Sequence, residues 1–293
     1  MAKYWLFWFF FRALGRLPLS ALYLLAILVA DASYLAFPAV RANVWDNLSH
    51  VMPEKTPKHR LRRAARQVFR TVTLYYADLA SLPRLDTRQF FDERLRVFGL
   101  KEHLLPAVES GRGVVMMSAH FGNPELVVQG LLAVGVNVLA LTEPQKPRRL
   151  SSLMDGIRAS KGHEFAPVSV GSVKRVVRTL KRGGTVALMG DRDIQGPRQR
   201  LPFFGEETWM PTGPIEVALR TGAIVIPCFA VRKGRIFEAF MEEPLELERT
   251  SAFQQDVRAG ALAFLARFEM RLREEPGQWA VLERVWEDEG RQV

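Results

Sequence analysis

Four residues separate a histidine from a glutamate in the segment 116–126, which reads Met-Met-Ser-Ala-His-Phe-Gly-Asn-Pro-Glu-Leu. Imidazole titrates near neutral pH, so His120 can act as a general base, and a nearby carboxylate such as Glu125 can orient its ring. The pattern also has an ordinary interpretation, because Asn123, Pro124 and Glu125 are all common helix-start residues. His120 and Glu125 are therefore candidate catalytic residues, and Asn123 is a candidate substrate contact.

A second cluster, Gly190-Asp191-Arg192-Asp193, follows an apolar run at residues 185–189. Arg192 could bind a phosphate or a developing oxyanion, and two carboxylates suit a divalent metal ion. Alternatively, both aspartates form ion pairs with Arg198 and Arg200, as surface carboxylates often do. Asp191, Arg192 and Asp193 are candidate substrate-binding residues.

Gly213 lies in Thr212-Gly213-Pro214, which is typical of a helix start whose free amide groups can receive an anion. The segment 203–211 before it, with Phe203-Phe204-Gly205 and Trp209-Met210-Pro211, predicts a loop that either lines an apolar channel or packs on the core. Cys228 is the single cysteine and lies in an apolar strand, so we expect an inert buried thiol.

Short apolar runs alternate with helical patterns from residue 83 onward, which predicts an α/β fold. We expect a mixed, mostly parallel sheet flanked by helices, because four of the five residues in each of the runs 114–118 and 185–189 are apolar. Both candidate clusters then follow the carboxyl ends of strands, where open α/β sheets bind ligands. Residues 90–98 are also predicted to form a strand.

The domain organisation follows from the same periodicity. Residues 1–82 predict an N-terminal helical region and residues 83–293 an α/β core, together one continuous unit of 293 residues. Hydrophobic residues make up 48% of the chain and charged residues 25%, which excludes general disorder.

The N-terminus contains the aromatic stretch 4–11 and an apolar run at 19–30, separated by Arg12, Arg16 and Pro18. Aromatic rings beside cationic side chains are typical of a segment that lies at a membrane surface. A single tilted span over residues 17–40, a cleaved signal peptide and an aromatic core helix are the alternatives. We expect membrane association.

Basic charge is concentrated toward the front of the chain. Residues 1–200 carry 30 basic against 15 acidic side chains, and residues 201–293 carry 11 against 16. Such a surplus attracts anionic partners. Nucleic acid is disfavoured because the aromatic residues are not interleaved with the arginines, so we expect anionic membrane lipids and no nucleic acid.

The chain resembles the bacterial lipid A biosynthesis acyltransferase family, which includes lauroyl and myristoyl transferases and phosphatidylinositol mannoside acyltransferases. The resemblance covers nearly the whole chain, and it begins with the His-x4-Glu pattern of residues 120–125. Further segments carry it: residues 11–18, 40–43 with 47–48, 65–70, 190–193, 202–205 and 210–214.

This resemblance implies a fatty acyl transfer from a thioester, acyl-CoA or an acyl carrier protein, to a hydroxyl of a glycolipid or lysophospholipid. His120 would be the general base and Glu125 its orienting carboxylate, with no cofactor and no metal. The implied location is the cytoplasmic face of the cytoplasmic membrane. A metal-dependent glycosyltransferase using Asp191 and Asp193, and a non-enzymatic membrane-binding protein, remain alternatives.

Overall fold

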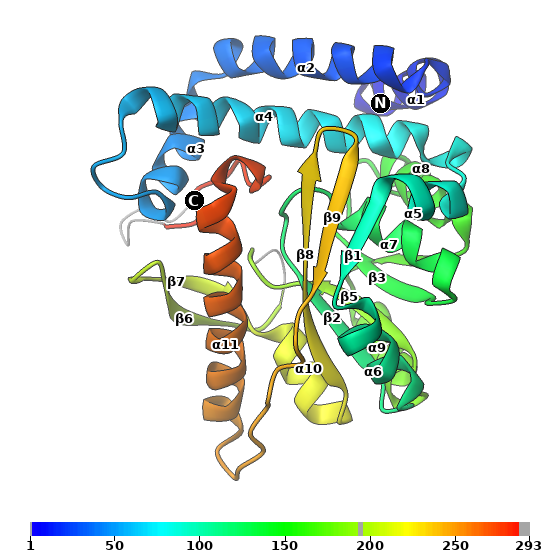
Figure 1. Ribbon diagram of the computed structural model, residues 1–293, viewed down its shortest axis with the longest axis vertical. Coiled ribbons are helices and arrows are strands. Elements are labelled where there is room, and N and C mark those ends of the chain that lie inside the picture. Colours follow the sequence, from blue (N-terminus) through cyan, green and yellow to red (C-terminus); the bar gives the residue numbers. More distant parts are fainter. Residues whose placement is uncertain (1, 193–195, 287–293) are drawn as a thin grey trace.

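A seven-stranded sheet forms the centre of the molecule (Figure 1). The computed structural model describes residues 2–192 and 196–286. The strands, in their spatial order, are β1 (Leu95–Phe98), β9 (Ile236–Met241), β8 (Ile224–Lys233), β2 (Val114–Ser118), β5 (Thr185–Met189), β3 (Val138–Thr142) and β4 (Glu164–Pro167). All neighbouring pairs are parallel except β8 and β9, which are antiparallel. The predicted mixed, mostly parallel α/β sheet is confirmed.

Helices cover both faces of this sheet. Their bounds are α1 (Ala2–Ala13), α2 (Leu19–Ala36), α3 (Pro38–Val51), α4 (Lys58–Ser81), α5 (Thr87–Arg94), α6 (Leu105–Glu109), α7 (Pro124–Leu131), α8 (Arg148–Arg158), α9 (Val170–Lys181), α10 (Gly213–Thr221) and α11 (Phe253–Glu274). Alternate residues of a strand face opposite sides of the sheet. Met116 of β2 accordingly packs in a core with α7 and α8, and Met117 packs in a second core with α10 and α11.

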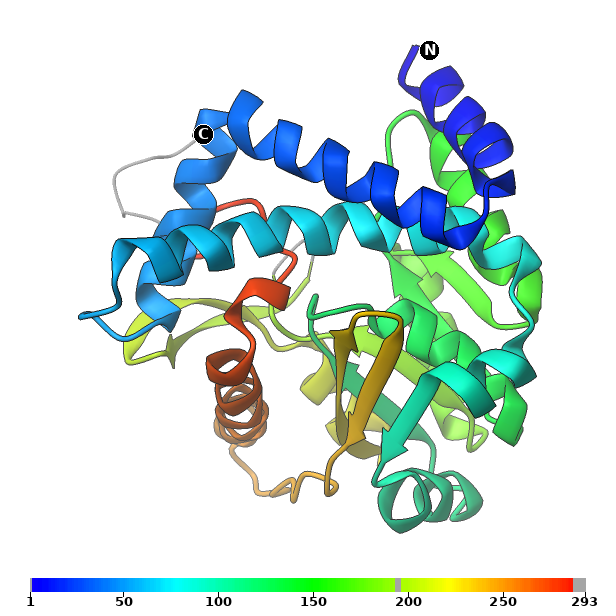
Figure 2. The same cartoon turned by 45° about the horizontal axis from the view of Figure 1, so that its top comes forward.

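The N-terminal helices form a layer across one end of the sheet (Figures 1 and 2). Helix α2 lies along α4, and α1 folds back beside α8. Two groups of hydrogen bonds, around Asp78 and around Asp31, hold α2 on α4. The Tyr23 hydroxyl donates to buried Asp78, and Asp31 accepts paired hydrogen bonds from Arg66 and Arg70.

Two predicted segments differ from the structure. Residues 90–94 belong to α5, because Asp86 caps that helix by accepting hydrogen bonds from the amides of Arg88 and Gln89. Only residues 95–98 form the predicted strand.

The predicted loop at 203–211 is a β-hairpin of β6 (Arg198–Phe203) and β7 (Glu206–Pro211). Phe204 and Gly205 form its two-residue turn with φ values of 53° and 83°. A two-residue hairpin turn of this class requires positive φ at both positions. Phe203 is fully buried in the core beside α11. Of the two roles expected from the sequence, lining a channel and packing on the core, the hairpin therefore has the second.

Candidate active site

The sheet brings His120 and Asp191 together from positions 71 residues apart. Ser118, the last residue of β2, pairs in register with Met189, the last residue of β5. His120 and Asp191 each lie two residues beyond these paired ends. Because parallel strands present their carboxyl ends at the same edge, both side chains meet there.

Asp191 holds the imidazole of His120. The ring Nδ1 lies 3.0 Å from Asp191 Oδ1, and the backbone amide of His120 donates to Oδ2 at 3.0 Å. An ionised carboxylate can only accept hydrogen bonds, so Nδ1 carries the proton. The neutral ring then presents an unprotonated Nε2, which is the form that a general base requires. The His120 side chain is 29% exposed, whereas Asp191 is fully buried.

His120 and Asp191 shift each other's pKa. Burial is the largest influence on His120 and lowers its pKa, but the charge and hydrogen bond of Asp191 outweigh it and hold the pKa above its usual range. Burial likewise raises the pKa of Asp191, yet the interactions with His120 and a hydrogen bond from Trp279 bring it below its usual value. Asp191 is therefore ionised at neutral pH, and it favours a proton on the adjacent ring.

The C-terminal segment completes this arrangement, and sequence reasoning missed it. The Trp279 indole Nε1 donates to Asp191 Oδ2 at 2.9 Å, and the ring is 2% exposed. Ala280 N donates to the His120 carbonyl at 2.7 Å, and Gly122 N donates to the Gln278 carbonyl at 2.8 Å. No local motif around Trp279 signals this role, since its partner lies 88 residues earlier.

Gly122 is required by this packing. Its φ is +63°, and a Cβ at this position would lie 2.2 Å from the carbonyl oxygen of Ala230. Only glycine combines that backbone conformation with so close an approach.

In this structure the carboxylate that contacts the His120 ring is that of Asp191, and Glu125 has other partners. Glu125 instead accepts hydrogen bonds from the Tyr75 hydroxyl at 2.5 Å and from Arg158 Nε at 2.9 Å. Arg158 Nη2 also donates to the Tyr75 oxygen at 2.8 Å, which closes a triangle. Glu125 lies in the first turn of α7, and that turn directs its side chain toward α4 and α8. Its catalytic role remains a prediction.

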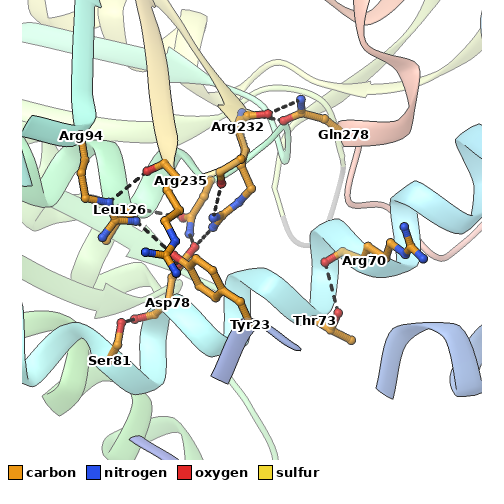
Figure 3. A network of polar contacts seen from close by, with 12 residues as sticks. Tyr23, Arg70, Thr73, Asp78, Ser81, Arg94, Leu126, Arg232, Arg235 and Gln278 are labelled. Carbon is orange, nitrogen blue, oxygen red and sulfur yellow. Dashed lines mark hydrogen bonds and ion pairs between the residues drawn. The ribbon is translucent and has the colours of Figure 1, made fainter. Parts of the chain in front are cut away.

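Asn123 caps α7 as predicted and joins it to a buried ionic network around Asp78, which Figure 3 shows with Tyr23 and Arg232. Asn123 Oδ1 accepts from the Leu126 amide at 3.0 Å, and Nδ2 donates to Asp78 Oδ2 at 2.7 Å. Asp78 also accepts from the Tyr23 hydroxyl at 2.6 Å and pairs with Arg232. Both polar ends of Asn123 thus bind protein groups, and its substrate contact stays a prediction.

The remaining candidates are more scattered. Arg192 forms ion pairs with Glu143 at 3.6 Å and with Glu283 at 3.2 Å, and Asp193 lies outside the described residues. Gly213 is the first residue of α10. Substrate binding by Arg192, Asp193 and Gly213 therefore remains a prediction. Within residues 2–192 and 196–286, no cluster of three or more His, Cys, Asp or Glu side chains could hold a metal ion.

An apolar cavity of about 60 Å³ adjoins the site, between the sheet and α7. Residues from six strands and α7 line it: Met116, Ser118, Pro124, Glu125, Val127, Val128, Ala140, Leu141, Thr142, Phe165, Ala187, Met189, Cys228, Phe229, Ala230 and Met241. Cys228 is buried as predicted, and burial raises the pKa of its thiol.

We expect an Asp191→Asn substitution to lower the His120 pKa from above its usual value of 6.5 to below it. The substitution removes the negative charge that stabilises the imidazolium and leaves burial, which opposes it. NMR titration of the His120 ring measures this shift. The matched control Glu125→Gln should leave the His120 pKa unchanged, and an equal shift in both variants would contradict Asp191 as the coupled carboxylate.

The sequence of this chain is similar to a known protein family and to curated mycobacterial proteins. The model of the family described as bacterial lipid A biosynthesis acyltransferase matches residues 1–288. The phosphatidylinositol mannoside acyltransferase of Mycobacterium tuberculosis H37Rv is 30% identical over 215 residues, which are 72% of this chain and 66% of that protein. The protein of the same name from Mycolicibacterium smegmatis is 28% identical over 263 residues, 88% of this chain and 83% of its own length.

The first of these alignments thus spans just under two thirds of the mycobacterial protein, whereas the family match extends over nearly all of this chain. By that match, the chain belongs to the bacterial lipid A biosynthesis acyltransferase family.

Proposed function

We propose that the protein is a membrane-associated O-acyltransferase that transfers a fatty acyl group from a thioester to a hydroxyl of a glycolipid or lysophospholipid. The donor is acyl-CoA or an acyl carrier protein. The observation that carries the proposal is the His120–Asp191 pair at the carboxyl edge of the sheet, in a member of an acyltransferase family.

In the proposed reaction, Nε2 of His120 takes the proton of the acceptor hydroxyl as its oxygen attacks the thioester carbonyl. A neutral alcohol is a weak nucleophile, so a positioned base accelerates this step. Asp191 fixes the ring tautomer and stabilises the imidazolium, as the carboxylate of a catalytic triad does. The thiolate leaves with the bond electrons, and the imidazolium returns the proton to it.

The adjacent cavity supports an acyl substrate. Its lining is almost entirely apolar, and its volume accommodates about four water-sized groups, enough for the first part of an acyl chain. Three of the lining side chains, Met116, Met189 and Met241, are unbranched and flexible. Rotation of these side chains would lengthen the cavity for the rest of the chain.

The proposal is tested by incubating the protein with isotope-labelled acyl-CoA or acyl carrier protein and a bacterial membrane lipid extract. We expect a new labelled ester by mass spectrometry, together with free thiol, and the same yield with EDTA. Heat-denatured protein is the control. Thiol release without a lipid ester would overturn the proposed transfer.

The alternative metal-dependent glycosyltransferase finds little support at Asp191. Its carboxylate accepts hydrogen bonds from the His120 ring, the His120 amide and Trp279, so a metal would have to displace these donors. Activity that depends on EDTA-removable metal and a nucleotide sugar would favour this alternative.

We also propose that α2 lies in the plane of the membrane, on the cytoplasmic face, where thioester donors are made. Residues 19–36 are long and apolar enough to span a membrane, with 22% of them buried. Yet the contacts of Tyr23 with Asp78, and of Asp31 with Arg66 and Arg70, hold α2 against α4.

The outer surface of α1 and α2 exposes apolar side chains that can insert into lipid. Leu24 and Leu28 of α2 are 60% and 58% exposed, and α1 exposes large aromatic side chains, Trp5, Trp8 and Phe9. Apolar and aromatic side chains beside cations are typical of helices that lie at a membrane interface.

We expect the double substitution Leu24→Ser and Leu28→Ser to weaken binding to anionic liposomes at least about tenfold, because each leucine loses apolar burial in the lipid. Co-sedimentation with liposomes measures this change. The matched control is Val170→Ser with Val173→Ser on α9, where the valines are 78% and 47% exposed. Equal binding by both variants would contradict docking through α2.

A further inference from the structure

The hydroxyl of Ser118 is a buried polar group without a hydrogen-bond partner. Ser118 ends β2 and is 6% exposed, and its Oγ contacts no donor or acceptor among the described residues. A buried hydroxyl without a partner destabilises a fold, because water is lost and nothing replaces it. Alanine would fill this position without that cost, so stability does not explain the serine.

Ser118 also lines the apolar cavity beside α7. The other polar side chains of the lining are engaged: Glu125 binds Tyr75 and Arg158, and Thr142 donates to Asp155 at 3.2 Å. Among the lining groups that the structure describes, the Ser118 hydroxyl is thus the polar side-chain group left for a ligand. Binding cavities typically combine apolar walls with a few such polar groups.

The chain direction brings Ser118 close to the proposed base. Ala119 and Phe121 are both fully buried in the core on the α11 face. Ser118 is the last residue of β2, and the chain turns at His120, where the Phe121 amide donates to the Ala119 carbonyl at 2.7 Å. The Ser118 hydroxyl and the proposed base thus lie two residues apart at the same strand end.

We propose that the Ser118 hydroxyl donates a hydrogen bond to the carbonyl oxygen of the bound acyl thioester. This proposal rests on the proposed function. A fatty acyl group has one polar end and an apolar tail, which matches one free hydroxyl in an apolar cavity.

The hydrogen bond would strengthen during the reaction. When the acceptor oxygen bonds to the carbonyl carbon, the carbonyl π electrons move to its oxygen, which becomes an oxyanion. The carbon–sulfur bond then breaks as the carbonyl re-forms, the thiolate leaves, and His120 passes the acceptor's proton to the thiolate. A donor aimed at this oxygen binds the oxyanion more strongly than the carbonyl, so its loss lowers kcat more than it raises KM.

Ser118→Ala tests the proposal, with Ser172→Ala as a matched control. Ser172 is also buried, 7% exposed, but its hydroxyl takes part in the capping box of α9 with Ser169. We expect Ser118→Ala to lower kcat about 10²-fold with Tm unchanged or raised. Ser172→Ala should show the reverse, a lower Tm with unchanged kcat.

Three outcomes would overturn the assignment of Ser118 as the donor to the thioester carbonyl. The first is a kcat of Ser118→Ala within about twofold of the wild-type value, and the second is a loss of activity that a lower Tm explains. The third is a loss of activity confined to hydroxylated acyl donors. The last outcome would place the hydroxyl against the chain instead of the carbonyl. A wild-type protein that transfers no acyl group would instead refute the proposed function, so the two failures are distinguishable.

Discussion

Replacing His120 by alanine is expected to lower the rate of acyl transfer at least about 10³-fold, because the acceptor hydroxyl loses its general base. The fold should survive. Asp191 loses one hydrogen bond but keeps those from the His120 amide and Trp279, so the free energy of unfolding should fall by only about 1–2 kcal/mol. Initial rates of ester formation, with circular dichroism at each protein concentration, measure both effects.

His59→Ala is the matched control, since His59 is exposed in the first turn of α4. It should leave the transfer rate unchanged. Turnover by His120→Ala close to that of the wild type would exclude His120 as the base.

The second large effect concerns stability. We expect Asp78→Asn to lower the free energy of unfolding by about 3–5 kcal/mol, because it leaves the charge of Arg232 buried without a counterion. The Asp78 side chain is 2% exposed and that of Arg232 is 8% exposed, so water cannot compensate. The side-chain NH2 group of the introduced asparagine would also face groups that donate hydrogen bonds to Asp78, namely the Tyr23 hydroxyl and Asn123 Nδ2. Two donors cannot bond to each other. Equilibrium denaturation in urea measures the change.

Asp31→Asn provides the comparison for this network. Asp31 pairs with Arg66 and Arg70 nearer the surface, where it is 20% exposed and the arginines are 50% and 31% exposed. The hydrogen bonds from these arginines hold its pKa far below the usual range, but solvent screens exposed pairs, so the loss of stability should be clearly smaller. Equal destabilisation by both variants would contradict a buried network that fixes α2, α4 and α7.

Local sequence patterns were sufficient for the main elements. The strands at 114–118 and 185–189 were predicted with the bounds that the structure shows, because buried parallel strands are nearly continuous apolar runs. The helix cap at Asn123 was also predictable from the sequence, since it depends on residues within one helical turn. Residues 90–94 differ from the prediction of a strand because the cap at Asp86 starts a helix that continues to Arg94.

The sequence by itself therefore determined the fold class, the family and the placement of both candidate clusters at the ends of strands. Only the tertiary structure decided which carboxylate meets His120. Glu125 is five residues away along the chain, but the turn into α7 points it at Tyr75 and Arg158. Asp191 is 71 residues away, yet the order of strands places β5 beside β2, and Trp279 joins from the C-terminal segment. Strand order depends on packing across the whole sheet, and no local spacing encodes it.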